Sequence, residues 1–546
     1  MTETAADNGE GRREARSTIH DPRSTINAPR LVDALTPNVL AALGTAELAA
    51  FLAPRRWYGA KAGTPSAARV RDVVSIPWEG GPFAVARIEV TPSAGGDPSL
   101  YQVPLCVRSL EEIGDQPPTS VIARVVAGDG EGLLFDAVED GAFLRGLAGA
   151  LAKPATFGSS GTQWIIEPVG GKALVVPANA EVRVGSAEQS NTSVIIDQLA
   201  ILKLFRKLAR GEHPDVEVTR FLTVDGGFTH TPVLLGVIRM VDESGSSVAG
   251  MLQEFLPKST DAWHYVLERS RPYFNAAADR AAPNDVLADA ERLGAITRDL
   301  HETLARGTTA ELAPERVTRE QLGRWAEGAR RWMGTALDLL ERQLRANAVP
   351  KGRVPDADAI LRRRDHFRAM VDEIVQTLGA DAGLATRIHG DYHLGQVLRT
   401  ASDDFMIIDF EGEPARSLAE RREKASPLRD VAGMLRSFAY AAATLGMEAK
   451  QLDMPTRELR VGRWERDTRD AFLRGYLKDA GSGSRGAGSD GREAQRQILP
   501  SDVGHTRALL RLFETEKAFY ELAYELNNRP DWVWIPIRGI SKLLVR

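Results

Sequence analysis

Two carboxylates and one amide in the C-terminal half have the types and the spacing that phosphoryl transfer needs. Asp391 lies in the segment His-Gly-Asp-Tyr-His (389–393), Gln396 follows, and Asp409 begins the segment Asp-Phe-Glu (409–411). Phosphoryl transfer requires a group that orients the acceptor hydroxyl, and oxygen ligands that hold Mg²⁺ on the phosphates. A protein-kinase catalytic loop spaces its Asp, its Asn and its second Asp in this way. The pattern therefore predicts a kinase with Asp391 as catalytic base.

The two histidines around Asp391 allow a second chemistry. His389, Asp391 and His393 alternate, so on a strand they could point the same way and ligate a metal, as in metallohydrolases. Such a site needs further ligands, and the nine histidines of the chain include no second clustered pair. We therefore expect His389 to support the loop through backbone contacts, and His393 to lie close enough to touch the substrate.

The periodicity changes along the chain in the way that a kinase fold requires. Up to Pro257 the chain is rich in alternating segments such as 83–90 and 182–205, which predict strands, and beyond it Leu293, Ile296 and Leu300 follow helical spacing. Inside the helical half we expect two short strands over 388–393 and 405–410, with a turn at 399–404. The predicted class is α+β: a bilobed protein-kinase-like fold with a β-rich N-lobe and a mainly helical C-lobe.

The N-lobe offers candidates for nucleotide binding. Lys203 lies in the apolar strand Ile-Leu-Lys-Leu-Phe, and Glu217, in a helix opened by Pro214, is its candidate partner. A surface lysine and a solvated acid are the alternative reading of that pair. A loop between two apolar strands would contact the phosphates, and the strand before Pro257 would be the hinge that receives adenine. These residues are Gln189, Ser190, Asn191, Thr192 and Ser193 in the loop, and Gln253, Glu254, Phe255 and Leu256 in the hinge.

Composition limits the compartment and the partners. The 546 residues carry a net charge of −5, so no overall positive field attracts nucleic acid or an anionic membrane. The single cysteine, Cys106, excludes an internal disulfide and points to the cytoplasm. We expect no membrane span, a disordered tail over 1–30, and a flexible Gly/Ser-rich insertion over 480–491.

With these residues in hand, the chain resembles the maltokinase family of the aminoglycoside-phosphotransferase and protein-kinase-like superfamily. The resemblance rests on residues 188–193, 387–398, 407–414, 426–438 and 524–532, with 56–59 similar to the family's N-terminal cap. It implies a cap over 31–135, an intermediate subdomain over 136–257 and a C-lobe over 258–546. It implies ATP as co-substrate, and Mg²⁺ held by Gln396, Asp409 and Glu411. Asp430 would brace the catalytic loop.

The same resemblance implies phosphorylation of maltose at its anomeric hydroxyl, which feeds α-glucan and glycogen synthesis from trehalose, and it leaves open whether a trehalose synthase binds. Lys517, Tyr520 and Tyr524 share one helix face on which a pyranose could stack, although core tyrosines would give the same spacing. A kinase for glucosamine or another sugar is the nearest alternative, since an amino sugar should require acidic residues in place of Lys517. A catalytically silent sugar- or nucleotide-binding regulator is the remote alternative.

Overall fold

The computed structural model describes residues 24–543, except 59–63, 94, 159–160, 171–173, 178, 186–190, 277–281, 415 and 479–496. The chain forms two compact units. The first contains Met1–His213 and Leu234–Phe255, and the second contains Pro214–Val233 and Leu256–Arg546. Because the short segment 214–233 belongs to the helical unit, it departs from the intermediate subdomain in which the sequence placed it. The α+β kinase-like class itself is confirmed.

The first unit is built on two sheets. One has the strand order β1-β5-β6-β4-β3-β2 with β12 paired to β4, and the other has the order β7-β8-β13-β14-β11-β10-β9. Strand β1 runs parallel to β5, and the other pairs are antiparallel. The strands of the first sheet are β1 (Thr25–Ala28), β2 (Pro65–Ile76), β3 (Phe83–Pro92), β4 (Ser99–Ser109), β5 (Val121–Ala127), β6 (Gly130–Asp136) and β12 (Lys207–Leu208). Those of the second are β7 (Ala155–Phe157), β8 (Gln163–Pro168), β9 (Val182–Val184), β10 (Thr192–Ile196), β11 (Ala200–Leu204), β13 (Leu234–Asp242) and β14 (Gly245–Glu254).

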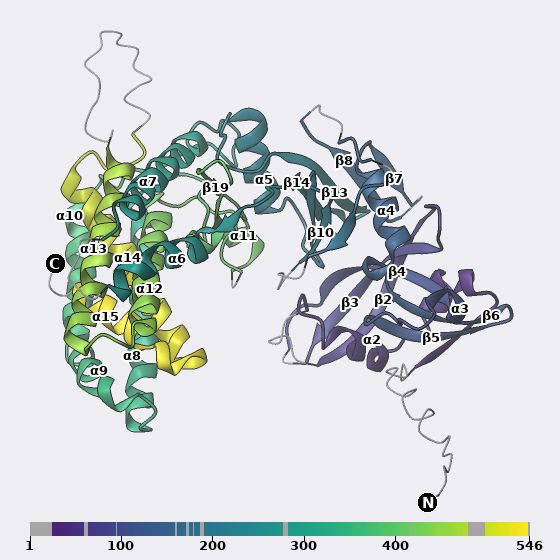
Figure 1. Cartoon of the computed structure of the whole chain (residues 1–546), viewed down its shortest axis with the longest axis horizontal. Helices are drawn as coiled ribbons and strands as arrows, with labels where there is room; N and C mark the ends of the chain where they lie inside the picture. The colour runs from purple at the N-terminus through teal and green to yellow at the C-terminus, as the bar shows by residue number, and fades with distance from the viewer. Residues whose placement is uncertain are drawn as a thin grey trace, which may run out of the picture. The chain divides into compact units, whose positions relative to one another are not determined.

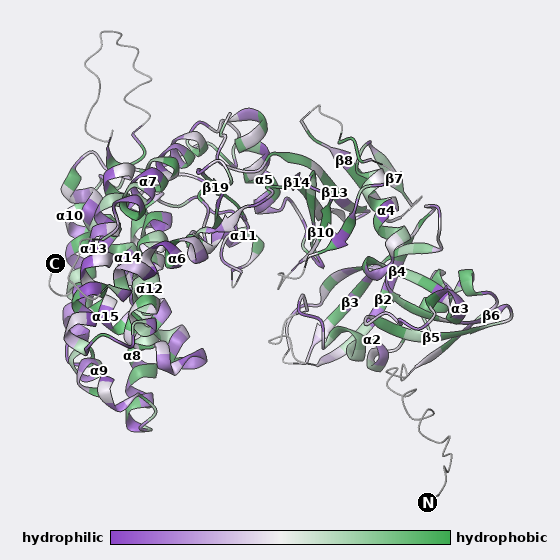
Figure 2. Cartoon of the chain, in the orientation of Figure 1, coloured by the Kyte–Doolittle hydropathy of each residue, from purple (hydrophilic) through white to green (hydrophobic). Residues whose placement is uncertain are grey.

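One hydrophobic core joins the two sheets of the first unit. It contains Phe83 and Val85 from β3, Ile238 from β13, and Phe143 and Leu147 from helix α4 (Gly141–Ala150). Helix α4 begins where the side chain of its N-cap Asp140 accepts the backbone N–H groups of the first turn. Figure 2 shows the hydrophobic character of β13 and β14. The remaining helices of this unit are short: η1 (Leu31–Leu35), α1 (Pro37–Leu40), α2 (Thr45–Leu52), α3 (Leu110–Ile113) and η3 (Ala137–Glu139).

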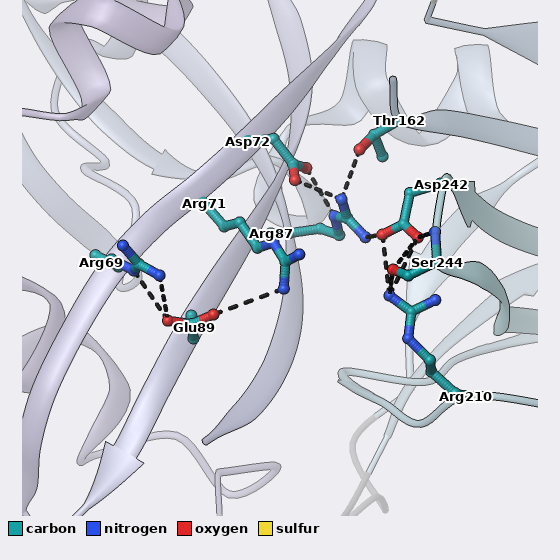
Figure 3. Close-up of polar contacts among 9 residues, drawn as sticks. All are labelled: Arg69, Arg71, Asp72, Arg87, Glu89, Thr162, Arg210, Asp242 and Ser244. Carbon is teal, nitrogen blue, oxygen red and sulfur yellow. Dashed lines mark hydrogen bonds and ion pairs between the residues drawn. The ribbon is translucent and has the colours of Figure 1, made fainter. Parts of the chain in front are cut away.

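A buried arginine links the same two sheets through polar contacts. Arg87 of β3 is only 4% exposed, and its guanidinium lies between Asp72 of β2 and Asp242 of β13, with Thr162 as a further partner (Figure 3). Arg210 and the Ser244 hydroxyl also bond Asp242. Burial alone would raise the pKa of the Asp242 carboxyl, but its hydrogen bonds to Ser244 and Arg87 hold that pKa well below its usual range. The carboxylate therefore stays charged beside the buried arginine.

The second unit is mainly helical, and its long helices pack side by side (Figure 1). The predicted positions Leu293, Ile296 and Leu300 are all buried on α7. Helix α8 is capped by the Thr318 hydroxyl and α14 by the Asp502 carboxylate. The helices are α5 (Pro214–Arg220), α6 (Ala262–Asn275), α7 (Asn284–Leu304), α8 (Arg319–Arg345), α9 (Val354–Leu361), α10 (Arg364–Leu378), α11 (Leu418–Arg421), α12 (Leu428–Glu448), α13 (Met454–Leu477), α14 (Val503–Asn528) and α15 (Trp534–Leu543), with the short turns η4 (Phe221–Asp225), η5 (Lys351–Arg353), η6 (Leu394–Gln396) and η8 (Pro530–Trp532).

Two small sheets interrupt these helices. Strands β15 (Thr260–Asp261), β18 (Val397–Arg399) and β19 (Phe405–Ile407) form one, and β16 (Glu315–Arg316) and β17 (Leu384–Ala385) form the other. The predicted strand over 388–393 is wrong, because the strand that pairs with β19 begins only at Val397. Residues 388–393 are a loop, since their backbone bonds go to side chains and not to a neighbouring strand.

Two predictions about mobile segments meet different outcomes. The predicted tail over 1–30 is wrong at its end, because Thr25–Ala28 form β1 and pair with β5. The predicted insertion over 480–491 lies outside the described residues. In the described part of the chain, each helix is either too short or too polar to cross a membrane.

Candidate active site

The loop that carries Asp391 is held by a buried carboxylate. Asp430, in the first turn of α12, accepts the backbone N–H of His389 at 2.7 Å and that of Gly390 at 2.9 Å. His301 lies 3.1 Å from the same carboxylate. Burial alone would raise the pKa of Asp430, but the bond to His301 and the neighbouring positive charges hold it below its usual value. The contacts are those expected of a brace for the catalytic loop.

The ring of His389 connects this loop to the strand that precedes Asp409. Its Nε2 lies 2.9 Å from the carbonyl oxygen of Ile408, and the residue is 1% exposed. This contact is consistent with a supporting role for His389, which stays a prediction. His393 lies with its Nε2 4.0 Å from the Asp391 carboxylate. Neither histidine belongs to a group of potential metal ligands among the described residues.

Asp409 occupies a tight turn that three neighbours define. Its φ of +70° is in the left-handed region, which few residues other than glycine adopt. The Gln396 amide donates to Asp409 Oδ2 at 2.8 Å, and the next backbone N–H, that of Phe410, donates to Asp215 at 3.0 Å. Phe410 itself is buried with its ring 5.0 Å from that of His389. The side chain and the backbone of Asp409 are thus fixed separately.

Three carboxylates converge at this turn. Oxygen atoms of Asp215, Asp409 and Glu411 all lie within 4.8 Å of one another, and Gln396 stands against Asp409. Carboxylate and amide oxygens are hard ligands, and such ligands suit Mg²⁺ better than metals that prefer thiolate or imidazole. The residues present therefore fit a magnesium ion. Asp215 was not anticipated, because its only sequence signal is that it is the acid directly after Pro214.

A cavity of about 450 Å³ opens beside Asp391 within the second unit. Its walls are the catalytic loop, the segment 412–425, and helices α8, α12 and α14. Its volume falls in the range of roughly 300–1,000 Å³ found for sites of small organic ligands. Among the side chains that line it are those of Trp332, Asp391, Glu413, Glu420, Arg429, Glu516, Lys517 and Tyr520.

Helix α14 presents a lysine and a tyrosine to this cavity. Lys517 Nζ lies 4.0 Å from Asp391 Oδ1 and 4.9 Å from the centre of the Tyr520 ring. The Trp332 ring of α8 meets the Tyr520 ring edge-on at 4.9 Å. Burial and the neighbouring Glu413 carboxylate raise the pKa of Tyr520, so its hydroxyl stays protonated. Tyr524 is 41% exposed, packs beneath Arg529, and does not line the cavity.

The charges around the cavity nearly balance. Seven lysines and arginines and six acids line it: Arg324, Arg331, Arg416, Arg421, Lys424, Arg429 and Lys517 face Asp391, Glu413, Glu420, Glu423, Asp430 and Glu516. Several acids are already bonded by side chains of this unit. Glu413 accepts from Arg416 at 3.2 Å, and Glu516 lies 3.0 Å from Arg429. The cavity therefore has no surplus of negative charge for a cationic ligand.

Of the predicted nucleotide residues, Glu217 and Leu256 belong to the second unit and the others to the first. Gln189 and Ser190 are outside the described residues, while Thr192 and Ser193 are buried on β10 directly after Asn191. Lys203 of β11 lies opposite Ser193 in the strand register. Gln253 and Glu254 end β14, and the chain passes from the first unit to the second between Phe255 and Leu256. Adenine binding at this segment stays a prediction.

Glu217 has partners within the second unit. It belongs to the second unit, on α5, and its carboxylate is bonded by Arg387 at 2.7 Å and by Arg422 at 2.6 Å. Pairing with Lys203 stays a prediction. The contacts within its own unit show that Glu217 has two other cationic partners, both far away in the sequence.

A family model and two known proteins are similar to this chain in sequence. Residues 51–140 match the model of the maltokinase N-terminal cap domain. A glucosamine kinase of Mycolicibacterium smegmatis is 27% identical over 363 residues, which cover 66% of this chain and 78% of that protein. A second glucosamine kinase, from Streptacidiphilus jiangxiensis, is 24% identical over 362 residues, 65% of this chain and 72% of that protein.

The fold is shared with solved structures as well. A glucosamine kinase in complex with glucosamine, ADP and inorganic phosphate superposes with a TM-score of 0.63 at 19% identity, over 92% of this chain and 98% of that one. A further crystal form of glucosamine kinase gives a TM-score of 0.65 at 19% identity, over 93% and 99%. The chain thus carries a maltokinase N-terminal cap domain, and its similarity to glucosamine kinases identifies it as a kinase-type phosphotransferase.

Proposed function

We propose that this chain transfers the γ-phosphoryl group of ATP to the anomeric hydroxyl of maltose and forms maltose 1-phosphate. The observation that carries the proposal is the continuous cavity that runs from Asp391 along Lys517 and Tyr520 to Trp332. Aromatic rings can stack on the apolar faces of sugar rings, and the lysine and the phenol can bond their hydroxyls. Asp391 lines the same cavity, and it is the group that contacts the reacting hydroxyl.

Asp391 acts as the base in the proposed reaction. Its carboxylate accepts the proton of the anomeric hydroxyl while the new bond between that oxygen and the γ-phosphorus forms. The bond between the γ-phosphorus and the oxygen that bridges it to the β-phosphorus breaks, and ADP leaves. Lys517, with its Nζ 4.0 Å from Asp391 Oδ1, places a positive charge beside the carboxylate.

The acids of the Asp409 turn would hold magnesium. Asp409 and Glu411 with Gln396 are the proposed ligands, and Asp215 fixes the turn that presents them. When bound, the ion neutralises the negative charge of the β- and γ-phosphates. The chain's own contribution is orientation, since Gln396 and the Phe410 backbone bond leave Asp409 little freedom to move.

Maltose is favoured over an amino sugar by the charges of the cavity. A site for glucosamine needs an acid free to bind its ammonium group, whereas Lys517 stands beside Asp391, and Glu413 and Glu516 already face arginines. The size of the cavity also leaves room beyond a single pyranose ring. Glucosamine remains the second candidate because the two relatives described above are both glucosamine kinases. The silent-regulator alternative has no support, since Asp391, Gln396 and Asp409 are all in place.

An acceptor panel tests the proposal. The full-length chain is incubated with ATP and Mg²⁺ and with maltose, glucose, glucosamine or trehalose, and ADP release is measured together with the phosphorylated sugar. We expect the highest kcat/KM with maltose and no product in the Asp391→Asn variant. Preference for glucosamine would reject maltose as the acceptor and support the sugar-kinase activity. No ADP release with any of these sugars would reject the proposed activity as well as the acceptor. A cytoplasmic location, supply of α-glucan synthesis and association with a trehalose synthase remain proposals that depend on this result.

A further inference from the structure

Glu217 joins two arginines from distant parts of the second unit. Arg387 precedes the catalytic loop, and Arg422 follows helix α11. Arg387 Nη1 lies 2.7 Å from Glu217 Oε2, and Arg422 bonds both carboxylate oxygens, at 3.1 Å through Nε and 2.6 Å through Nη2. One carboxylate on α5 therefore connects the start of the catalytic loop to the segment 420–425.

Burial makes this charge arrangement hard to replace. The side chains of Glu217 and Arg387 are 11% and 2% exposed, and that of Arg422 is 29% exposed. Arg387 also donates to the backbone carbonyl of Arg422 at 3.1 Å, so the two arginines lie together. Burial and the charge of Arg422 lower the pKa of Arg387, and Glu217 opposes that shift. Without the Glu217 carboxylate, the buried guanidinium of Arg387 would lie beside the like charge of Arg422, which is unfavourable.

The segment that Arg422 anchors is a wall of the acceptor cavity. Its neighbours Glu420, Arg421, Glu423 and Lys424 line the cavity, while Arg422 reaches to α5. The end of the wall is also bonded next to Arg387, because Ala425 and Thr386 exchange two backbone hydrogen bonds of 2.9 Å. Thr386 is the residue before Arg387. The wall is thus fixed against the catalytic loop by one backbone bridge and one shared glutamate.

We propose that Glu217 is a positioning residue for the acceptor sugar, which holds the wall 420–425 in register with the Asp391 loop through Arg387 and Arg422. This inference rests on the proposed sugar-kinase function, and it gives Glu217 a role on the acceptor side of the reaction. Helix α5 then supports two parts of the site. Asp215 bonds the Asp409 turn through the Phe410 N–H, and Glu217 bonds Arg422 in the acceptor wall.

Arg422→Gln is the most direct test, because it leaves the buried pair of Glu217 and Arg387 in place. We expect the Kd for maltose, measured by calorimetry, to rise about tenfold, as loss of one charge-assisted pair predicts. The Kd for ADP should change by less than about twofold. Backbone amides of residues 420–425 should exchange hydrogen faster than in the wild type. Glu217→Gln should show the same pattern, more strongly, if it folds.

The control is Arg220→Gln, which removes an arginine from the same helix, and it should change none of these quantities. Weaker ADP binding with unchanged sugar binding in Arg422→Gln or Glu217→Gln would overturn the proposal, and so would unchanged exchange of the wall. If the wild-type chain phosphorylates no sugar, the proposed function fails by that result alone, while the exchange experiment still decides whether Glu217 and Arg422 fix the wall.

Discussion

Lys517 Nζ and Asp391 Oδ1 lie 4.0 Å apart, so the proposed catalytic base has a cation of the acceptor helix beside it. The distance is longer than a hydrogen bond, which leaves Lys517 able to bond a sugar hydroxyl while it still attracts the carboxylate. In the proposed reaction, the charge of Asp391 and the binding of the acceptor sugar by Lys517 therefore influence each other electrostatically. Predictions for the two residues differ, because one acts on the reacting hydroxyl and the other on the bound sugar.

Asp391→Asn should abolish turnover and preserve nucleotide binding. The amide cannot accept the proton, and we expect kcat to fall by roughly 10³-fold or more, within the range of general-base and positioning effects. The loop should keep its shape, since Asp430 holds the backbone of His389 and Gly390 and not the side chain of Asp391. Calorimetry with ADP and Mg²⁺ gives the comparison, and a variant with more than about a tenth of wild-type turnover would exclude Asp391 as the base.

Lys517→Met should weaken the binding of maltose and shift the acceptor preference toward glucosamine. Loss of a bond to a hydroxyl should raise the KM for maltose about tenfold, whereas loss of a positive charge removes the repulsion of an ammonium group. The ratio of kcat/KM for glucosamine to that for maltose should therefore increase. Lys450→Met, at an exposed position after α12, is the matched control. An unchanged ratio would show that Lys517 does not face the acceptor.

Two substitutions at Asp215 should have different effects. Asp215→Asn keeps an oxygen that can accept the Phe410 N–H, whereas Asp215→Ala removes it and frees a turn whose Asp409 has a φ of +70°. We expect kcat to fall about 10²-fold in the alanine variant, with more Mg²⁺ needed for half-maximal activity, and clearly less in the asparagine variant. Mn²⁺ binding in the presence of ADP provides a readout apart from turnover. Equal losses in both variants would indicate direct ligation of the metal by Asp215.

Asp242→Asn should destabilise the first unit in a pH-dependent way. Arg87 is buried and keeps only Asp72 as an acid partner, so we expect a loss of about 2 kcal/mol in the free energy of unfolding at pH 7. Because the pKa of Asp242 is lowered in the folded state, its contribution is complete above the usual value of 3.8 and disappears as the pH falls through the lower folded value. The difference between variant and wild type should therefore narrow below about pH 4.

Glu89→Gln is the control variant for Asp242→Asn. Glu89 pairs with Arg69, whose side chain is 72% exposed, so Glu89→Gln should cost less than about 1 kcal/mol at every pH (Figure 3). Urea unfolding monitored by tryptophan fluorescence measures both variants. A constant difference for Asp242→Asn from pH 7 to pH 3 would mean that its carboxylate does not contribute through its charge.

Local spacing predicted the part of the site that is local in sequence. Gln396 and Asp409 meet because they flank the hairpin of β18 and β19, and Asp391 lies in the loop just before Gln396. The first strand of the hairpin was placed wrongly at 388–393, since the alternation there comes from loop residues, of which His389 and Gly390 bond Asp430. Periodicity cannot distinguish a strand from a loop whose backbone is satisfied by a distant carboxylate.

Long-range contacts were the part that the sequence could not supply. Asp215 meets Phe410 across 195 positions, and Glu217 meets Arg422 across 205. Glu217 fitted the spacing of a lysine partner, but charge alone does not tell which of many cations a carboxylate will face. No sequence motif marks Trp332, and only the packing of α8 beside α14 brings it to the cavity.

The shared core of the two sheets makes the cap inseparable from the second sheet. Phe83 and Val85, inside the cap-domain match, pack in the same cluster as Val194 and Ile238. A chain shortened to begin after residue 140 would lose a third of the buried residues of that cluster and would deprive Asp242 of Arg87. The cap and the strands that carry Thr192 and Lys203 should therefore unfold in a single cooperative transition, and loss of the cap should be seen as aggregation and not as a smaller active kinase.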